Sequence, residues 1–170
     1  AAAGNTGGSA FAIAAAGNPL MGVLTIERNR INLDPASVGT CTAAGTTLSL
    51  PWCGGIDSQA SRSVIVNNVV FGTKAPRSTA VWLHNPEMAP QTVVLNGNYL
   101  DGAGTANAAQ NRSAAVVLTI NTGVATSVGR IRNNILVGGA GATRYGVLEH
   151  SALTKTCTFE TLESNDFFLG

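Results

Sequence analysis

The sequence has little charge of either sign. Only 11% of its 170 residues are charged, ten Lys and Arg stand against nine Asp and Glu, and the formal net charge is +1. Proteins that bind nucleic acid or an anionic membrane usually present a basic stripe, so we expect neither partner. No apolar run reaches the roughly 18 residues of a membrane-spanning helix, so we expect no membrane span.

Glu, Lys and Leu are too scarce for a helical bundle, whereas an apolar content of 45% is too high for a disordered chain. The chain is instead rich in Thr, Val, Asn, Gly and Ser, which favour strands joined by turns. Its length is sufficient for one domain with a hydrophobic core, and we expect residues 1–170 to form a single domain.

Cysteines are also few. Cys41 and Cys53 flank a stretch rich in Gly and Thr, and we predict a disulfide between them, as is usual in an oxidising compartment. The pairing of Cys157 is left open. Three buried free thiols are the alternative, because free cysteine is among the most buried residue types. With the disulfide, we expect a secreted or cell-surface protein.

What the chain does contain is a repeat. The phrase IRNNILVGG at 131 to 139 resembles IVNNVVFG at 65 to 72, and three further segments align with them on one asparagine. The successive spacings of 39, 30, 36 and 31 residues are in the range of solenoids. The aligned segments are LTIERNRINL on Asn29, VIVNNVVFG on Asn68, VLNGNYLDG on Asn98, RIRNNILVGG on Asn134 and TLESNDFFLG on Asn165.

Two positions of this alignment are apolar in every copy, and a third is mostly polar. Three residues before the asparagine stand Ile26, Ile65, Leu95, Ile131 and Leu162. Two residues after it stand Ile31, Val70, Leu100, Leu136 and Phe167. Two residues before it stand Glu27, Val66, Asn96, Arg132 and Glu163. Because side chains of a strand alternate between its faces, the apolar columns are predicted to face a core and the polar column to face solvent.

Each asparagine is also preceded by another strand-like run, and no segment shows a helical period. These runs lie at 11–13, 47–50, 80–83, 115–120 and 145–150. Short strands that cannot pair within their own repeat must pair with the next one, which stacks the repeats into parallel sheets around a continuous core. The sequence therefore predicts an all-β fold, a parallel β-helix (solenoid) of about five coils.

The repeat form resembles the right-handed parallel β-helix superfamily, which includes pectate lyases and surface proteins with NosD-like repeats. The resemblance covers almost the whole chain and implies a right-handed solenoid. The repeated asparagine is predicted to sit at a corner between two sheets, where Asn tolerates a left-handed or bridge conformation. Stacked amides can hydrogen-bond along the solenoid axis, so we predict a structural ladder rather than a ligand-binding set. Its members are Asn29, Asn68, Asn98, Asn134 and Asn165.

Catalytic residues are not evident in the sequence. Enzymes of this fold carry carboxylates, or carboxylates with Arg or Lys, on neighbouring coils of one outward face, and the nine acidic residues form no such motif. The segment RIR at 130 to 132 is only weakly similar to the Arg-Ile-Lys element of polygalacturonase-like hydrolases. We predict no catalytic residue, no metal and no cofactor, and leave open whether the protein is an enzyme.

A saccharide site is the sharper hypothesis for the outward residues. Arg132 and Glu163 stand on adjacent coils of the polar column, where an exposed ion pair is the alternative. Trp82 is expected to face outward, either as a platform for a sugar or covered by a loop.

The two histidines are the remaining candidates for this site. His84 and His150 each follow a strand-like run, with Asn121 expected at the same edge on the coil between them. Solvated strand ends are the alternative for all three side chains.

These features predict a non-enzymatic, extracellular structural or adhesive β-helix module of a bacterial surface or filament protein, with a polysaccharide or cell-surface glycan as partner. The alternative is a polysaccharide lyase or glycoside hydrolase of the pectate-lyase-like fold. No capping segment is evident at either end, and FFLG follows Asn165 directly. Since solenoid ends need covers, we expect a longer chain or self-association end to end.

Overall fold

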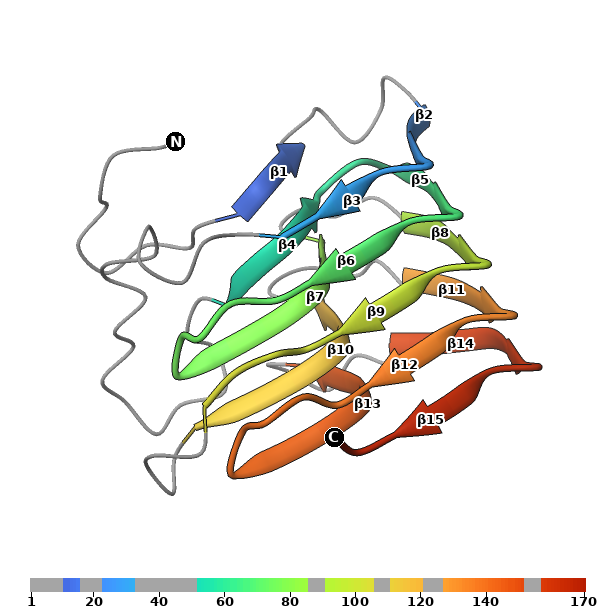
Figure 1. Cartoon of the computed structure of the whole chain (residues 1–170). Coiled ribbons are helices and arrows are strands. Elements are labelled where there is room, and N and C mark those ends of the chain that lie inside the picture. The colour runs from blue at the N-terminus through green and yellow to red at the C-terminus, as the bar shows by residue number, and fades with distance from the viewer. Residues whose placement is uncertain are drawn as a thin grey trace.

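The structure is a computed structural model of the chain, and it describes residues 11–15, 23–32, 52–85, 91–105, 111–120, 127–151 and 157–170. All of the regular secondary structure in these ranges is β-strand. Fifteen strands form three sheets of five strands, and each sheet takes one strand from each of five successive coils (Figure 1). The chain is therefore a parallel β-solenoid of five coils, as the sequence predicts.

We call the three sheets A, B and C in the order in which each coil passes through them. Sheet A contains β1 (Phe11–Ala15), β4 (Cys53–Ser58), β7 (Arg77–Asn85), β10 (Arg112–Ile120) and β13 (Thr143–Ser151). Sheet B contains β2 (Val23–Glu27), β5 (Arg62–Val66), β8 (Gln91–Asn96), β11 (Ser127–Arg132) and β14 (Cys157–Glu163). Sheet C contains β3 (Arg30–Ile31), β6 (Val69–Phe71), β9 (Tyr99–Asp101), β12 (Ile135–Val137) and β15 (Asp166–Phe168). Every pairing is parallel.

The two apolar columns are in register and line the core. In sheet B, Ile65 pairs with Leu95, and Leu95 with Ile131; in sheet C, Leu100 pairs with Val70 and Leu136. These central side chains are fully buried. The predicted columns are correct for the first four coils.

The fifth coil differs from the other four. Leu162 is 47% exposed and Phe167 is 51% exposed, although each pairs in register with a buried residue of the fourth coil. In the part of the chain that the structure describes, β14 and β15 are edge strands, and no sixth coil packs against these two side chains. The expectation of five buried members in each column is therefore wrong for the last coil.

The corner between sheets B and C is made by two consecutive residues with separate tasks. The residue before the ladder asparagine has a positive φ in every coil, at Arg28, Asn67, Gly97, Asn133 and Ser164. The ladder asparagines are not among the residues with positive φ. Of the two conformations predicted for the ladder residue, left-handed or bridge, the left-handed one is thus wrong. The preceding residue turns the chain, and the turn directs the asparagine side chain inward.

The first strand of the second coil is also displaced from its predicted place. The run at 47–50 was expected to form it, but the strand that pairs with β1 and β7 is β4, and 47–50 lie outside the described residues. Two consecutive glycines make β4 inconspicuous in the sequence. They are required there, because a Cβ on Gly54 would lie 1.6 Å from the carbonyl oxygen of Thr79, and one on Gly55 would lie 2.2 Å from Val70 Cγ1.

Candidate functional site

The asparagine corner fixes the scaffold beneath the outer faces. From the second coil to the fifth, each ladder Oδ1 accepts two hydrogen bonds from the preceding coil, one from the backbone N–H and one from the Nδ2 amide of its asparagine. For Asn98 Oδ1 these bonds come from Asn68 and measure 2.9 and 3.1 Å; for Asn134 Oδ1 they come from Asn98, at 2.9 Å each. The same pattern joins Asn29 to Asn68 and Asn134 to Asn165.

The amides of the ladder also satisfy backbone carbonyls inside the solenoid. Nδ2 of Asn98 donates to the Ile65 carbonyl at 2.8 Å, and Nδ2 of Asn134 donates to the Leu95 carbonyl at 3.1 Å. Asn68, Asn98 and Asn134 are at most 2% exposed. Buried amides with partners on both sides carry no desolvation penalty for missing hydrogen bonds. The geometry therefore gives these side chains a structural role.

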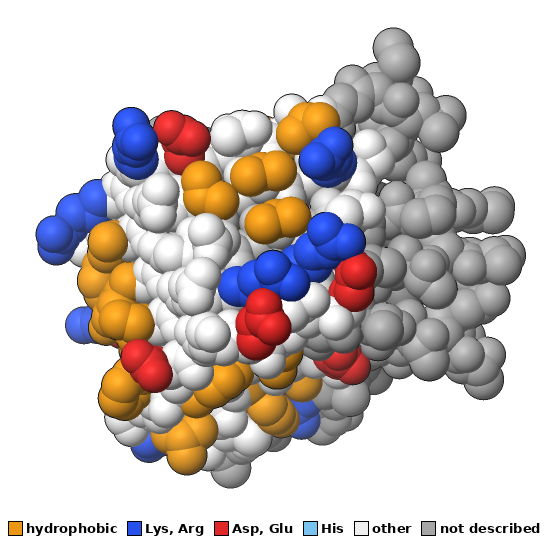
Figure 2. Space-filling view, turned by 90° about the vertical axis from the view of Figure 1, so that its right-hand side faces the viewer, with side chains coloured by type: hydrophobic (Ala, Val, Ile, Leu, Met, Phe, Trp, Pro, Cys, Tyr) orange, Lys and Arg blue, Asp and Glu red, His pale blue; other side chains and the backbone are white. Residues whose placement is uncertain are grey.

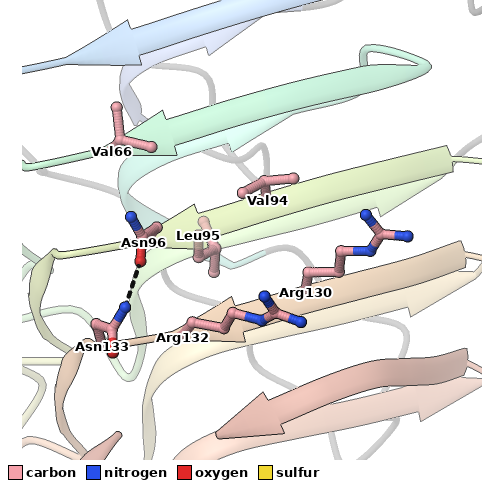
Figure 3. A pocket seen from close by; sticks show the side chains of 7 residues that line it. All are labelled: Val66, Val94, Leu95, Asn96, Arg130, Arg132 and Asn133. Carbon is pink, nitrogen blue, oxygen red and sulfur yellow. Dashed lines mark hydrogen bonds between the residues drawn. The ribbon is translucent and has the colours of Figure 1, made fainter. Parts of the chain in front are cut away.

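The outer face of sheet B carries a shallow hollow. A depression of about 400 Å³ lies over β5, β8 and β11 and the turn that follows β11 (Figure 3). We call it the sheet B depression; it is lined by Val66, Val94, Leu95, Asn96, Arg130, Arg132 and Asn133. Nδ2 of Asn133 donates to Oδ1 of Asn96 at 2.9 Å, which fixes the two amides at the corner (Figure 3).

Two ion pairs border the depression on the side of the fifth coil. Arg130 donates from Nε and Nη2 to the two carboxylate oxygens of Glu160, at 2.7 and 2.9 Å. Arg132 Nε lies 2.9 Å from Glu163 Oε1. Sequence reasoning placed Arg132 and Glu163 on adjacent coils, and the structure brings them together as the exposed ion pair that was the alternative to a saccharide site.

Sequence reasoning missed the second ion pair because of a local irregularity. The register of β11 and β14 shifts between Gly129 and Arg130, so that Gly129 pairs with Phe159 and Arg130 with Thr161. Glu160 is the extra residue of this β-bulge, which re-aims a side chain. A strict alternation of faces gives no signal for such a bulge.

Arginine contacts set the electrostatics of this face. The hydrogen bonds from Arg130, with the nearby charges of Arg130 and Arg132, lower the pKa of Glu160, and Glu160 in turn raises the pKa of Arg130. All four side chains of the two pairs are about half exposed, so water screens these charges. In space-filling view the face shows basic side chains next to acidic ones, with an apolar patch beside them (Figure 2).

Trp82 does not form the exposed sugar platform that was one expectation. It points away from the solenoid core, but it is only 6% exposed and packs in a second cluster on the outer side of sheet A with Trp52, Ala114 and Val117. Its Nε1 donates to Thr119 Oγ1 at 2.8 Å, and its ring stacks on Phe11 with centroids 5.7 Å apart. Neighbouring apolar residues of the cluster cover it, so the reading as a covered residue is correct.

The two histidines occupy the same register position of sheet A, two coils apart. Thr119 of β10 pairs with His84 of β7 on one side and with His150 of β13 on the other. Thr119 thus takes the intermediate position for which Asn121 was expected. Asn121 and the side chains of both histidines lie outside the described residues, so their part in a saccharide site stays a prediction.

One unusual carboxyl was not singled out from the sequence. Asp57 of β4 pairs in register with Trp82 and is 7% exposed. Its Oδ1 has no hydrogen-bond partner, and Gln59 Nε2 donates to its Oδ2 at 3.4 Å. Burial raises the pKa of Asp57 to about 6, against a smaller lowering by the Gln59 hydrogen bond. Nothing in CGGIDS signals a buried acid.

The remaining chemical candidates can be placed within the described part of the chain. In these ranges no three His, Cys, Asp or Glu side chains gather as a metal site would require, and no helix is long and apolar enough to cross a membrane. Cys53 is disulfide-bonded. Cys41 lies outside the described residues, so the Cys41–Cys53 pairing stays a prediction.

Comparison with protein-family models, with curated proteins and with solved structures found no match. The functional reading therefore depends on the geometry of the outer faces alone.

Proposed function

We propose that this chain is a non-enzymatic β-helix module of an extracellular bacterial surface or filament protein, and that its sheet B depression binds an acidic polysaccharide. The observation that carries the proposal is the pairing of both outward glutamates of β14 with arginines at the border of that depression.

The paired glutamates are poorly suited to acid–base catalysis. A general acid in a glycoside hydrolase needs a raised pKa, and its partner carboxylate must be available to a water or to the sugar. Arg130 lowers the pKa of Glu160 instead, and Arg132 holds Glu163. These contacts favour a binding face over a reaction centre.

The same arginines are suited to binding carboxylates. A guanidinium has five N–H donors, and Glu160 takes hydrogen bonds from two nitrogens of Arg130, so donors remain for a ligand. The amides of Asn96 and Asn133 can bond sugar hydroxyls, while Val66 and Val94 offer apolar contact. This combination fits a polymer of sugar acids better than a neutral one.

The scaffold supports a structural role. A continuous ladder of hydrogen-bonded amides, buried in the three central coils, holds the five coils in one register, and the disulfide at Cys53 fits an oxidising, extracellular compartment. We assign the solenoid to the right-handed parallel β-helix superfamily as part of this proposal, since parallel crossover connections are almost always right-handed.

End-to-end association belongs to the same proposal. Leu162, Phe167 and Phe168 are about half exposed on the fifth coil. A face of this kind favours contact with another coil or another subunit. Light scattering over a range of protein concentrations measures it, and a mass that stays that of one chain at every concentration contradicts it.

The catalytic alternative, a polysaccharide lyase or hydrolase, has one observation in its favour. Asp57 has the raised pKa of a general acid or base, but its carboxyl is buried on the outer side of sheet A. Incubation with acidic and neutral polysaccharides, followed by assays for reducing ends and unsaturated products, decides between the two readings. We expect no product, and product formation that Asp57→Asn abolishes would establish the enzyme.

The binding test uses the same polymers. We expect the intact protein to bind polygalacturonate or alginate with an affinity that decreases as salt increases. An Arg130→Gln, Arg132→Gln double variant should lose this binding, whereas Val23→Ala, an exposed substitution at the far end of sheet B, should not. Equal binding by all three proteins would refute the assignment of the depression.

A further inference from the structure

The outer face of sheet C differs in chemistry from that of sheet B. Its outward positions on the three central coils are Val69, Phe71, Tyr99, Asp101, Ile135 and Val137, and we call this set the sheet C platform. The alternating residues Val70, Leu100 and Leu136 are buried in the core, which fixes the direction of the platform side chains.

The platform side chains lie side by side across three coils. Tyr99 pairs in register with Val69 on one side and with Ile135 on the other. Asp101 pairs in the same way with Phe71 and Val137. The platform is thus two adjacent columns of three residues, five of them apolar or aromatic.

Two aromatic rings form its centre. The rings of Phe71 and Tyr99 have centroids 5.7 Å apart and planes tilted by 50°. Both residues are partly exposed, and Ile135 beside them is 39% exposed. Because the ring planes are tilted, the two rings do not stack face to face. Their faces form a shallow, open angle that offers amphipathic contact area to a ligand.

A single carboxylate accompanies the rings. Backbone N–H of Ala103 donates to Asp101 Oδ1 at 2.7 Å, which orients the carboxyl group next to Phe71. Neither Lys nor Arg occupies any of the six platform positions. Arg30 lies on the first coil and Asp166 on the fifth, at the two ends of the platform.

We propose that the sheet C platform binds a neutral polysaccharide, with sugar rings lying on Phe71 and Tyr99 and a sugar hydroxyl donating to Asp101. The apolar faces of pyranose rings match aromatic faces, and an oriented carboxylate accepts hydrogen bonds from hydroxyl groups. The charge of the platform selects against acidic sugars, because Asp101 repels their carboxylates and neither Lys nor Arg stands among the six platform positions.

A glycan fits the platform better than a second copy of the chain. Two columns of three residues cover on the order of 200 Å², given the spacing of strands and of alternate residues. A stable protein interface buries about 800 Å² per partner. The platform is therefore too small for a stable dimer, but it can hold a few sugar rings.

The test is co-sedimentation of the intact protein with cellulose, chitin and insoluble xylan, together with titration of soluble neutral oligosaccharides. We expect Tyr99→Ala and Phe71→Ala each to weaken binding between about threefold and tenfold. Tyr99→Phe keeps the ring and should retain most of the affinity. Val23→Ala, on the other face, is the matched control and should bind as the unchanged protein does.

Ile135→Asp keeps the test decisive if a ring variant fails to fold, since Ile135 is already exposed and its replacement adds a charge to the platform. We expect it to abolish binding to neutral polymers while circular dichroism shows that the variant stays folded, although the new carboxylate faces Asp166 on the next strand and should lower the melting temperature. Retained binding in folded Ile135→Asp overturns the proposal. So does an effect confined to the sedimentation coefficient, which would indicate self-association.

The polymers separate this proposal from that for the sheet B depression. Binding of polygalacturonate that depends on Arg130 and Arg132, with no binding of neutral polymers, overturns the sheet C platform alone. Binding of neutral polymers that depends on Tyr99, with no binding of acidic ones, overturns the sheet B assignment alone.

Discussion

At the corner between sheets B and C, two consecutive residues perform the two roles that the sequence suggested for one asparagine: one turns the chain, and the other forms the ladder hydrogen bonds. Asn68 uses its buried side chain to bond Asn98 and the Ile26 carbonyl. Asn67, immediately before it, has a φ of 56° and an exposed side chain. Two repeats have two consecutive Asn residues at this corner. The first makes the left-handed turn, and the second supplies the ladder amide.

The turn position predicts a simple substitution result. Asn67→Val should lower the free energy of unfolding by about 1 to 2 kcal/mol, because a β-branched residue is disfavoured at positive φ. Asn67→Gly should change it by less than about 0.5 kcal/mol, because the third coil has Gly97 at the same position with a φ of 66°. Urea denaturation measures both variants, and equal losses in the two would contradict the assigned turn.

Asp57 predicts a dependence of stability on pH. Its pKa is raised from 3.8 to about 6, so between these values the folded protein holds a proton that the unfolded chain releases. Stability should therefore be highest below the unfolded pKa, decrease as the pH rises to about 6, and stay low above it. A shift of this size corresponds to about 3 kcal/mol.

The Asp57→Asn variant removes the titrating group and keeps its shape. We expect this variant to be the more stable of the two at neutral pH and to lose the decrease between pH 4 and pH 6. Thermal unfolding at a series of pH values measures the difference. The same decrease in both proteins would show that another group causes it.

At the scale of the strand, the sequence predicts what repeats and misses what is local. The columns through Leu95 and Leu100 are visible because each coil places an aliphatic residue at the same register. β4 is obscured by Gly54 and Gly55, which close backbone contacts require, and the bulge at Glu160 breaks the alternation of faces. Trp82 is buried by a separate apolar cluster on the outer side of sheet A. The alternation of apolar and polar residues along a strand does not predict such a cluster.

The columns also predict how the cost of a truncation depends on the coil. Leu95→Ala in the third coil should lower the free energy of unfolding by about 2 to 5 kcal/mol, because it leaves a cavity in a packed core. Leu162→Ala, at the same column position in the fifth coil, should cost less than about 1 kcal/mol, because that side chain is 47% exposed. Chemical denaturation gives both values, and equal costs would contradict the different burial of the two positions.

At the scale of the whole molecule, one internal ladder supports outer faces that differ in chemistry. The sheet A face is covered by aromatic residues, the sheet B face carries Arg–Glu pairs, and the sheet C face carries two partly exposed rings. Because the five coils stack in the same way, the fold can be predicted from the repeat in the sequence. The functions we propose depend on the outward positions, which vary from coil to coil and are less constrained by the repeat.

The most direct test of the ladder-supported solenoid is hydrogen exchange of the asparagine side-chain amides, followed by nuclear magnetic resonance. The Nδ2 protons of Asn68, Asn98 and Asn134 should exchange only when the whole domain unfolds, because these amides are buried and bonded to neighbouring coils. Those of exposed Asn29 should exchange quickly. Exchange of the three central amides as fast as that of Asn29 would contradict the stacked ladder and the five-coil fold built on it.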